Sequence, residues 1–516
     1  MNVKIYDTTL RDGSQGEGIS LSLDDKLKIA KRLDTLGVHY LEGGWPGSNP
    51  KDILFFEKVR ELDLKKIKIA AFGSTRRKDI SASSDANLKA LVAAKPDTAC
   101  IFGKTWDLHV KEALRTTLDE NIKMIYDSLK YLKENGLEVV YDAEHFFDGY
   151  KANPEYALKT LKSAEDAGAD NITLCDTNGG LLPSEVENIF KAVKNVIHTP
   201  LGIHTHNDSG MADANSLLAV TNGAVLVHGT INGYGERCGN ADLCVLIPNL
   251  QLKLKMLDDI NIKSLRDASL YVSEIANMVP RDNQPYVGMS AFTHKAGIHV
   301  SAMQRNEKTY EHINPSEVGN IRRIIVSELA GKSNILEKAK ELNVSFKSDD
   351  EIQSILELIK KKEHEGYHYE GADASLELLF KRGAGLYKPM FGLEGFRVTI
   401  ESDANGNIRS EASLRVTVNG EIEHTAAEGD GPVNALDNAL RKALEKFYPV
   451  LKDVSLSDFK VRVINAEGGT AAKVRVLIES RDESGEWSTI GVSENIIEAS
   501  WFALVDSIEY KLLKRK

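Results

Sequence analysis

The sequence predicts an α/β protein in which a closed (β/α)8 TIM barrel is followed by helical linker subdomains and a C-terminal α+β domain. Over residues 1–275, eight short apolar runs alternate with amphipathic helical patterns, which suits a parallel barrel. No Gly-x-Gly-x-x-Gly motif follows the first run, and this disfavours the alternative, an open doubly wound sheet. After residue 275 the alternation stops, and strand-rich patterns take over near residue 386.

The barrel helices carry recognisable end signals. Ser22 is placed to cap a helix over Asp24–Leu36, because its hydroxyl can accept from the first free amides. A helix over Pro154–Ala167 should end at Gly168, and Pro183 should lie in the first turn of a helix over Pro183–Val196. The eight predicted strands are Val3–Asp7, Tyr40–Gly43, Ile67–Phe72, Thr98–Phe102, Glu138–Tyr141, Asn171–Leu174, Leu201–His204 and Val225–His228.

Three domains are expected, over residues 1–275, 276–385 and 386–516. Residues 280–320 are rich in proline and glycine and are predicted to be irregular, with helices following near Glu328–Leu342 and Asp349–Gly366. Arg382–Pro389 is interpreted as a linker. The last domain is interpreted as a repeated β-β-β-α pattern, from strands at Phe391–Glu401, Ser410–Val418, Glu421–Ala427, Val454–Ile464 and Ala472–Ser480 and helices at Pro432–Phe447 and Asn495–Leu513.

Composition narrows the class of protein. A formal net charge of −11 argues against a nucleic-acid-binding surface. Four cysteines without a Cys-x-x-Cys spacing argue against a disulfide framework or a structural zinc site. No run of ~20 apolar residues occurs, so no membrane span is expected. Because the first residues run straight into a strand with no leader pattern, we expect a cytoplasmic protein.

A metal site is predicted where the seventh strand ends. His204 and His206 are two residues apart, so on a strand their rings lie on one face about 7 Å apart, within reach of one ion. Asp12 follows the first strand, and a barrel brings that strand beside the seventh and eighth. Asn240 ends a glycine-rich loop after strand eight and can lend a carbonyl oxygen. This donor set suits Mn²⁺ or Mg²⁺, with Zn²⁺ as a further option.

Each of these residues also has an ordinary structural interpretation. Two histidines at this spacing can simply line a wet sheet face. Arg11 and Asp12 can form a loop ion pair that contributes ~0–1 kcal/mol to stability. Asn240 can be a turn residue. The metal hypothesis therefore depends on all of them converging at one point.

Several motifs resemble the isopropylmalate synthase family of metal-dependent barrel enzymes. The resemblance runs through nearly the whole chain. Its segments are Tyr6–Gln15, Glu42-Gly-Gly-Trp-Pro-Gly-Ser-Asn-Pro, Leu201–Gly210, Gly239-Asn240, Phe292-Thr-His-Lys-Ala-Gly-Ile-His, Tyr310-Glu-His-Ile-Asn-Pro-Ser-Glu-Val-Gly, Ser327-Glu-Leu-Ala-Gly-Lys-Ser and Gly429-Asp-Gly-Pro. The resemblance implies a Claisen-type condensation of acetyl-CoA with a 2-oxo acid. Trp45, where many relatives carry Phe, is typical of the members that use pyruvate and form citramalate.

The same resemblance implies residue roles. Asp12, His204, His206 and Asn240 match the metal ligands, and Arg11 matches a cation that stabilises oxyanion or enolate charge. Glu144 matches an acidic residue beside the keto acid. Thr177 and Gln15 match substrate-binding side chains. His299 and Tyr310, from the segment after the barrel, match a pair implicated in deprotonating the acetyl methyl group. The strand-end residues Phe72, Phe102 and Asp142 are expected to line the substrate pocket.

The resemblance also implies regulation by the tail. Residues 386–516 match an amino-acid-binding domain, with isoleucine as the expected effector and Gly429, Asp430, Gly431, Pro432, Gly468 and Gly469 as its candidate residues. A homodimer is implied, in which residues 276–385 reach the neighbouring barrel. Isopropylmalate or homocitrate formation stays open. An aldol-cleaving lyase is less favoured, because such relatives carry a catalytic Cys before the metal-binding Asn and Gly229–Tyr234 has none.

Overall fold

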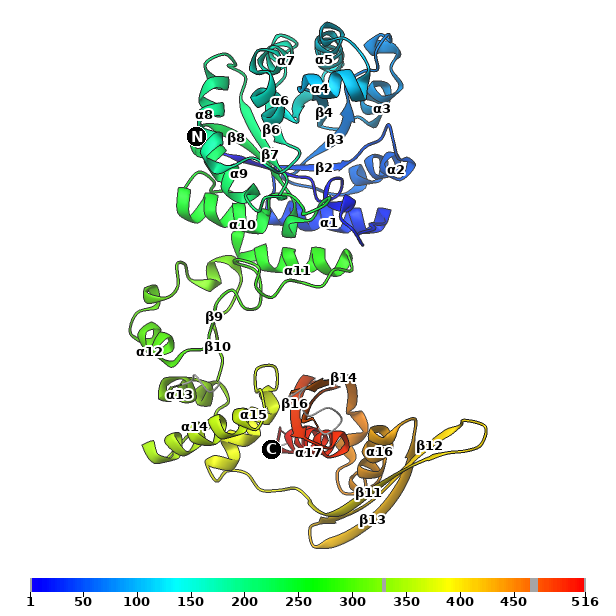
Figure 1. Cartoon of the computed structure of the whole chain (residues 1–516), viewed down its shortest axis with the longest axis vertical. Coiled ribbons are helices and arrows are strands. Elements are labelled where there is room, and N and C mark those ends of the chain that lie inside the picture. The colour runs from blue at the N-terminus through cyan, green and yellow to red at the C-terminus, as the bar shows by residue number, and fades with distance from the viewer. Residues whose placement is uncertain (1, 327–330, 465–471, 515–516) are drawn as a thin grey trace. The chain divides into compact units, whose positions relative to one another are not determined.

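The computed structural model describes residues 2–326, 331–464 and 472–514. These residues form two compact units, one of residues 1–292 with 313–321 and one of residues 293–312 with 322–516. The first unit is built on eight parallel strands that close into a barrel in sequence order (Figure 1). The predicted (β/α)8 barrel is confirmed. Its strands are β1 (Lys4–Asp7), β2 (Tyr40–Gly44), β3 (Lys68–Ser74), β4 (Thr98–Lys104), β5 (Glu138–Glu144), β6 (Asn171–Asp176), β7 (Leu201–Thr205) and β8 (Ala224–Gly229).

The barrel closes between its first and last strands. Lys4 lies opposite Leu226 and Asp7 opposite Gly229 in the parallel β1–β8 pair. The loops after β1, β7 and β8 therefore meet at one end of the barrel, where side chains of distant sequence segments can converge.

Local signals fix the helix ends as expected. Ser22 and Asp25 form a reciprocal capping box at α1, and Gly168, with φ of 89°, follows α7 in the left-handed conformation. The helices of the first unit are α1 (Leu23–Leu36), α2 (Pro50–Lys58), α3 (Ala86–Ala94), α4 (Asp107–His109), α5 (Leu118–Glu134), α6 (Phe146–Ala152), α7 (Pro154–Asp166), α8 (Pro183–Lys194), α9 (Ala212–Thr221), α10 (Leu243–Pro248) and α11 (Leu265–Ile275).

The barrel has an outer and an inner core. Ile5, Leu41 and Ile101 belong to the large outer core against the helices, and Tyr6, Phe72 and Cys100, on the alternate strand positions, form a smaller inner cluster. Because successive strand residues face opposite sides, this separation follows from the strand period. The inner positions also include fully or nearly buried polar residues, Glu42, Asp142 and His228 among them.

The second unit begins with short elements and helices. Its first part contains β9 (Thr293–His294), α12 (Gly297–Arg305), β10 (Arg323–Ile324), α13 (Lys332–Glu341), α14 (Asp349–His364) and α15 (Asp373–Gly383). The expectation that residues 280–320 are irregular throughout was wrong, because α12 forms there. The start of the predicted helix at Glu328 lies outside the described residues.

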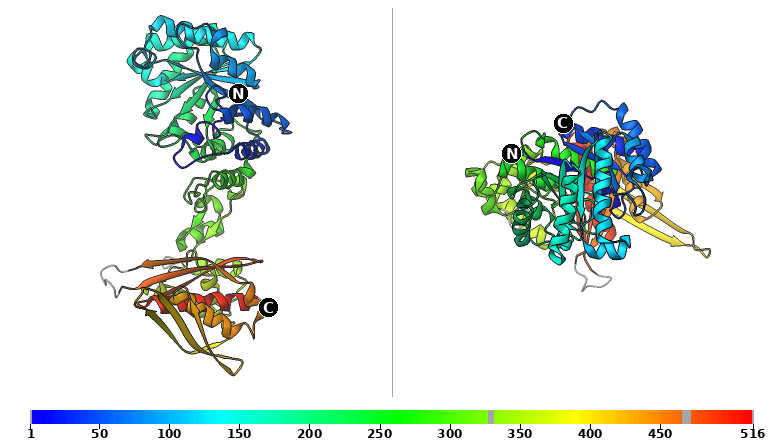
Figure 2. Two further views of the ribbon diagram at one scale, coloured as in Figure 1. Left: turned by 90° about the vertical axis from the view of Figure 1, so that its right-hand side faces the viewer. Right: turned by 90° about the horizontal axis from the view of Figure 1, so that it is seen from above.

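The tail carries the repeated β-β-β-α pattern. Its elements are β11 (Gly392–Ser402), β12 (Ile408–Val418), β13 (Glu421–Gly429), α16 (Pro432–Leu444), β14 (Ser455–Val463), β15 (Val474–Asp482), β16 (Gly485–Ser493) and α17 (Ile496–Lys514). Both three-stranded sheets are antiparallel, and the two helices lie between them (Figure 2).

One strand, β16, was missing from the sequence prediction. Its face against α17 carries Thr489 and Gly491. A short polar residue and a residue without a side chain obscure the apolar alternation there. A Cβ on Gly491 would lie 1.9 Å from the carbonyl oxygen of Ala499, so only glycine permits this approach. None of the described helices is long and apolar enough to cross a lipid bilayer.

Candidate active site

Three residues from two ends of the barrel sequence meet in a buried cluster. The ligand atoms of Asp12, His204 and His206 all lie within 4.8 Å of one another. Asp12 Oδ2 is 3.4 Å from His204 Nε2 and 3.9 Å from His206 Nε2. The two histidines are only 6% and 5% exposed, so they do not line a wet sheet face.

Asn240 completes the donor set from the loop after β8. Asn240 forms an isolated antiparallel β-bridge with His206, and Asn240 is 2% exposed. Its side-chain oxygen has no hydrogen-bond partner among the described residues. A buried amide oxygen without a partner is costly, and an ion bound beside it would satisfy that oxygen. One carboxylate, two imidazoles and one amide oxygen fit a divalent cation with open positions.

Electrostatics keep this donor set ready to bind a cation. Burial alone would raise the pKa of Asp12, but the Arg11 guanidinium and the neighbouring imidazoles outweigh it and hold that pKa well below its ordinary value. Burial lowers the pKa of His204 to about 3 and also lowers that of His206. The carboxylate is therefore charged and both imidazoles are neutral near pH 7, which are the protonation states that metal ligands require.

Arg11 is fixed beside the cluster by a residue that the sequence analysis missed. Its Nε lies 2.5 Å from Glu42 Oε1, while Glu42 Oε2 accepts a 2.9 Å hydrogen bond from the Tyr6 hydroxyl. The guanidinium carbon also lies 3.7 Å from the centre of the Phe72 ring. Glu42 is the middle residue of β2 and the first of the quoted Glu42-Gly-Gly-Trp motif, and that position was the available signal.

The predicted pocket residues Phe72, Phe102 and Asp142 lie on the inner side of neighbouring strands. The rings of Phe72 and Phe102 stack at 5.4 Å, and Trp45 packs edge-on against both, at 5.6 and 5.8 Å. Asp142 is 4% exposed and its Oδ1 lies 4.0 Å from His228 Nδ1. Burial, reinforced by the Glu42 charge, raises the pKa of Asp142 to about 8. His228 was not singled out from the sequence, and Trp45 was singled out only as typical of the relatives that use pyruvate.

Three further predicted residues lie at or near strand ends, with different environments. Glu144 ends β5 and forms an ion pair with Lys104, which ends β4. The Thr177 hydroxyl, just after β6, accepts a 2.9 Å hydrogen bond from the backbone amide of His145. Gln15 ends the short 3₁₀ turn η1 (Gly13–Gln15) and is exposed.

His299 and Tyr310 belong to the second unit. Their rings stack at a centroid distance of 4.1 Å, although ten residues lie between them in sequence. Tyr310 is 45% exposed. Nearby, Glu311 accepts from Arg322 at 2.7 and 2.6 Å and lies 3.3 Å from His294, a network that sequence reasoning did not detect.

Comparison with known proteins agrees along the whole chain. Residues 2–272 match the family described as HMGL-like, residues 286–366 the homocitrate synthase post-HMGL domain-like family, and residues 370–512 the LeuA allosteric (dimerisation) domain. The (R)-citramalate synthase of Geobacter sulfurreducens is 59% identical over 516 residues, which cover 99% of this chain and 98% of that protein. The (R)-citramalate synthase of Aquifex aeolicus is 56% identical over 517 residues, with the same coverage of both chains.

The chain belongs to the (R)-citramalate synthase family. Its resemblance to isopropylmalate synthase relatives is thereby confirmed. Among solved structures, HMG-CoA lyase of Bacillus subtilis matches with a TM-score of 0.47 and 19% identity, over 55% of this chain and 96% of that chain.

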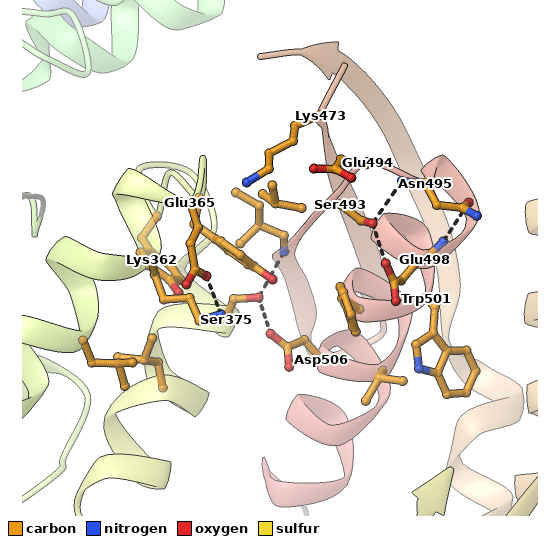
Figure 3. A pocket seen from close by; sticks show the side chains of 18 of the residues that line it. Lys362, Glu365, Ser375, Lys473, Ser493, Glu494, Asn495, Glu498, Trp501 and Asp506 are labelled. Atoms are coloured by element: carbon orange, nitrogen blue, oxygen red, sulfur yellow. Dashed lines mark hydrogen bonds and ion pairs between the residues drawn. The ribbon is translucent and has the colours of Figure 1, made fainter. Parts of the chain in front are cut away.

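The second unit of this (R)-citramalate synthase family member contains a cavity of about 850 Å³, which is lined by the part that matches the allosteric domain and by the end of α14 with the residues just after it. It lies between α14–α15 and the β16–α17 turn (Figure 3). At its centre the Ser375 hydroxyl donates to Asp506 at 2.7 Å, while Trp501 and Ile490 supply apolar wall. Charged side chains of both signs, Lys362, Glu365, Glu494 and Glu498 among them, surround the opening (Figure 3).

The predicted effector residues that the structure describes, Gly429–Pro432, do not line this cavity. Gly429–Pro432 forms the turn between β13 and α16, where the Asp430 amide donates to the Asn434 side chain at 3.1 Å. A Cβ on Gly429 would lie 2.4 Å from the Ala435 nitrogen, so the turn requires glycine there. Gly468 and Gly469 lie outside the described residues.

Proposed function

We propose that this protein condenses acetyl-CoA with pyruvate and water to give (R)-citramalate and free CoA, a reaction that serves isoleucine biosynthesis. The observation that carries this proposal is the full-length relationship to two (R)-citramalate synthases at 59% and 56% identity. The buried cluster at Asp12, His204 and His206 supports it, because a carbonyl electrophile needs a site that stabilises negative charge.

The cluster is proposed to hold a divalent cation, with Mn²⁺ or Mg²⁺ favoured over Zn²⁺ because half of the donors are oxygen. Asp12, His204, His206 and Asn240 are its proposed ligands. When bound there, such a cation supplies Lewis-acid polarisation of the keto group.

The barrel residues have separable proposed roles. Arg11 holds the charge that develops on the keto oxygen, and its pairing with Glu42 keeps the guanidinium from rotating away. Thr177 and Gln15 bind the substrate carboxylate and the adjacent polar groups. Glu144 is the acidic group beside the keto acid, and Phe72, Phe102 and Asp142 shape the space for its methyl group.

His299 is proposed as the base that removes a proton from the acetyl methyl group, with Tyr310 orienting its ring. The stacked pair supports this, since neutral imidazole is well suited to general-base work near pH 7. The enolate carbon then bonds to the keto carbon of pyruvate, the C=O π electrons move to the keto oxygen, and the resulting alkoxide takes up a proton to become the hydroxyl group. Water afterwards attacks the thioester carbonyl, and CoA leaves as the thiol. A His299→Ala variant should lose exchange of the acetyl methyl protons with solvent deuterium.

A thiol-release assay tests the substrate assignment. Acetyl-CoA is supplied with pyruvate, 2-oxobutyrate, 2-oxoisovalerate or 2-oxoglutarate, and kcat/KM is compared. We expect pyruvate to give the highest value. A higher kcat/KM with 2-oxoisovalerate or 2-oxoglutarate would instead assign isopropylmalate or homocitrate formation. One methylene changes the binding free energy in the transition state by only ~1–3 kcal/mol. The kcat/KM values of the four acids must therefore be measured under the same conditions.

The tail is proposed to form a homodimer and to bind isoleucine as a feedback inhibitor, and residues 276–385 to reach the neighbouring barrel. The match of residues 370–512 to an allosteric (dimerisation) domain supports this. The 850 Å³ cavity offers space for an amino acid. Truncation after residue 389 should remove the inhibition by isoleucine. Unchanged inhibition of the truncated chain would refute the assignment.

A further inference from the structure

One cavity of the first unit is lined by cationic and apolar side chains, which suit a phosphorylated ligand better than a small keto acid. It measures about 460 Å³ and lies at the carboxyl ends of β3 and β4, beside α5. Its floor is apolar, formed by Phe102, Leu114 and Met124. Its remaining walls include four cationic side chains, Arg76, Arg77, Lys78 and Lys104, and no acidic one.

Two of these cations already have partners. Arg76 is 5% exposed and donates to Glu120 at 2.8 Å and to Asp127 at 2.8 and 3.0 Å, both on α5. Its backbone amide donates to Ser128. Lys104 is paired with Glu144. Arg76 therefore anchors the loop after β3, and it sets the positions of the two residues that follow.

Arg77 and Lys78 are the unneutralised pair. Both are exposed, and within the described residues no carboxylate lies at ion-pair distance from either side chain. Lys78 donates instead to the backbone oxygen of Arg115 at 2.8 Å, which holds its ammonium at the cavity. The Arg77 backbone amide donates to Asp85 at 3.0 Å, which fixes the chain there. Two adjacent cations on an anchored loop are a phosphate-binding arrangement.

The cavity also adjoins the proposed reaction centre. Phe102 lines it and stacks on Phe72, whose ring lies under the Arg11 guanidinium. Lys104 lines it and pairs with Glu144. A ligand with an apolar amide arm and a polyanionic end can therefore run from the cationic loop across an apolar floor toward the barrel mouth.

Two other cavities of this unit are less suited. One is lined by Arg237 and Arg281, but these face Asp208 and Asp242, and Glu17 is also in its wall. The other contains Lys65 and Lys66 but lies at the amino ends of β3 and β4, the opposite end of the barrel from the metal-ligand cluster.

We propose that the cavity of Arg77 and Lys78 binds the phosphate-bearing end of the acyl-CoA co-substrate, with the pantetheine arm along Phe102 and Leu114. This rests on the proposed function, which supplies acetyl-CoA as a substrate. Arg77 and Lys78 are binding residues only, so they contribute to the KM for the thioester and not to the chemical step.

The test replaces both charges by neutral side chains of similar length, in an Arg77→Gln, Lys78→Met variant. Kinetics are measured with acetyl-CoA and with S-acetyl-N-acetylcysteamine, which carries the same thioester and no phosphate. We expect the KM for acetyl-CoA to rise roughly 10–100-fold, as for loss of charge-assisted hydrogen bonds. The kcat, the KM for pyruvate and kcat/KM with the truncated thioester should stay within about twofold.

The matched control removes two charges at the other end of the barrel, in a Lys65→Met, Lys66→Met variant, which should keep the wild-type KM for acetyl-CoA. An unchanged KM in the Arg77→Gln, Lys78→Met variant, or equal losses with both thioesters, would overturn the proposal. A rise in the KM for acetyl-CoA in an Arg281→Gln variant, in place of the Arg77→Gln, Lys78→Met variant, would also overturn the proposal.

A binding measurement separates this proposal from the proposed reaction. Calorimetry with CoA and with adenosine 3′,5′-bisphosphate, in the absence of pyruvate, reports on the cavity alone. The Arg77→Gln, Lys78→Met variant should bind both ligands more weakly by the same factor as its rise in KM. If the wild type binds CoA but does not condense acetyl-CoA with pyruvate, the reaction assignment fails and the cavity assignment stands. If both proteins bind CoA equally, the cavity assignment fails.

Discussion

Arg11 and Glu42 form a buried ion pair, with Nε and Oε1 2.5 Å apart and side-chain exposures of 15% and 0%. Glu42 is in turn held by the Tyr6 hydroxyl, and Arg11 reaches toward Asp12, whose Oδ2 lies 3.4 Å from its Nη1. The arrangement connects an inner barrel position to the metal-ligand cluster. The orientation of Arg11 therefore depends on a residue that does not itself contact the cluster.

Replacing Glu42 by Gln should lower kcat about 10²-fold, because Arg11 loses the charge that fixes its orientation. Glu42 is a positioning residue, so the KM for acetyl-CoA should change by less than about threefold. Tyr6→Phe removes only one hydrogen bond to Glu42 and should cost less than about tenfold in kcat. Thiol release measures both, with circular dichroism as the folding control. A kcat for Glu42→Gln within twofold of wild type would contradict the positioning role.

Replacing Asp12 by Asn should abolish tight metal binding. The variant keeps the size of the side chain but loses the one charged ligand, so the Kd for Mn²⁺ should rise more than about 100-fold by calorimetry. Chelator-treated wild type should regain activity with Mn²⁺, and the variant should not. Asp7→Asn is the matched control, because Asp7 is buried at the end of β1 and accepts hydrogen bonds from Thr9 instead of contacting the cluster. Equal Mn²⁺ affinity in wild type and Asp12→Asn would exclude the site.

Asp142 should make the stability of the barrel fall as pH rises. Its carboxyl has a pKa of about 8 in the folded protein, against an ordinary value of 3.8. Between these values the folded state binds one more proton than the unfolded state, so unfolding becomes easier as pH increases. Asp142→Asn removes this titration. The melting temperature of the variant should fall less than that of wild type between pH 6 and pH 9, as followed by calorimetry. Parallel melting curves would show that Asp142 is ionised throughout.

Shortening Phe102 should widen the choice of keto acid. Phe102→Leu opens space in the aromatic cluster with Phe72 and Trp45, so kcat/KM for 2-oxobutyrate relative to pyruvate should rise about tenfold. Phe56→Leu, a buried change outside this cluster, should leave the ratio unaltered. The comparison uses the same thiol-release assay. An unchanged ratio for Phe102→Leu would show that the methyl group of pyruvate binds elsewhere.

The barrel could be predicted because its sequence pattern repeats at regular intervals. Apolar runs and helical patterns recur eight times, and caps such as Ser22 and Gly168 mark where helices begin and end. The clustering of Asp12 with His204 and His206 was also predictable, since a closed barrel forces the first strand beside the last two. The β16 strand was missed because Thr489 and Gly491 occupy positions where α17 comes too close for large side chains.

The supporting residues of the site were harder to predict for a physical reason. Glu42 and His228 point into the barrel from strands that otherwise look like core, and a single polar residue in an apolar strand has no pattern of its own. Their partners, Arg11 and Asp142, are distant in sequence and become neighbours only in the folded barrel.

The closing pair of β1 with β8 has a consequence for biosynthesis of the enzyme. Asp12 is synthesised near the start of the chain, whereas His206 and Asn240 emerge almost two hundred residues or more later. A nascent chain lacking its last two strands holds a lone carboxylate and can retain no ion there. The metal-ligand cluster should thus form in a single late step of synthesis on the ribosome. A circularly permuted gene, whose chain begins at another loop of the barrel, should change when this step occurs without altering the finished enzyme.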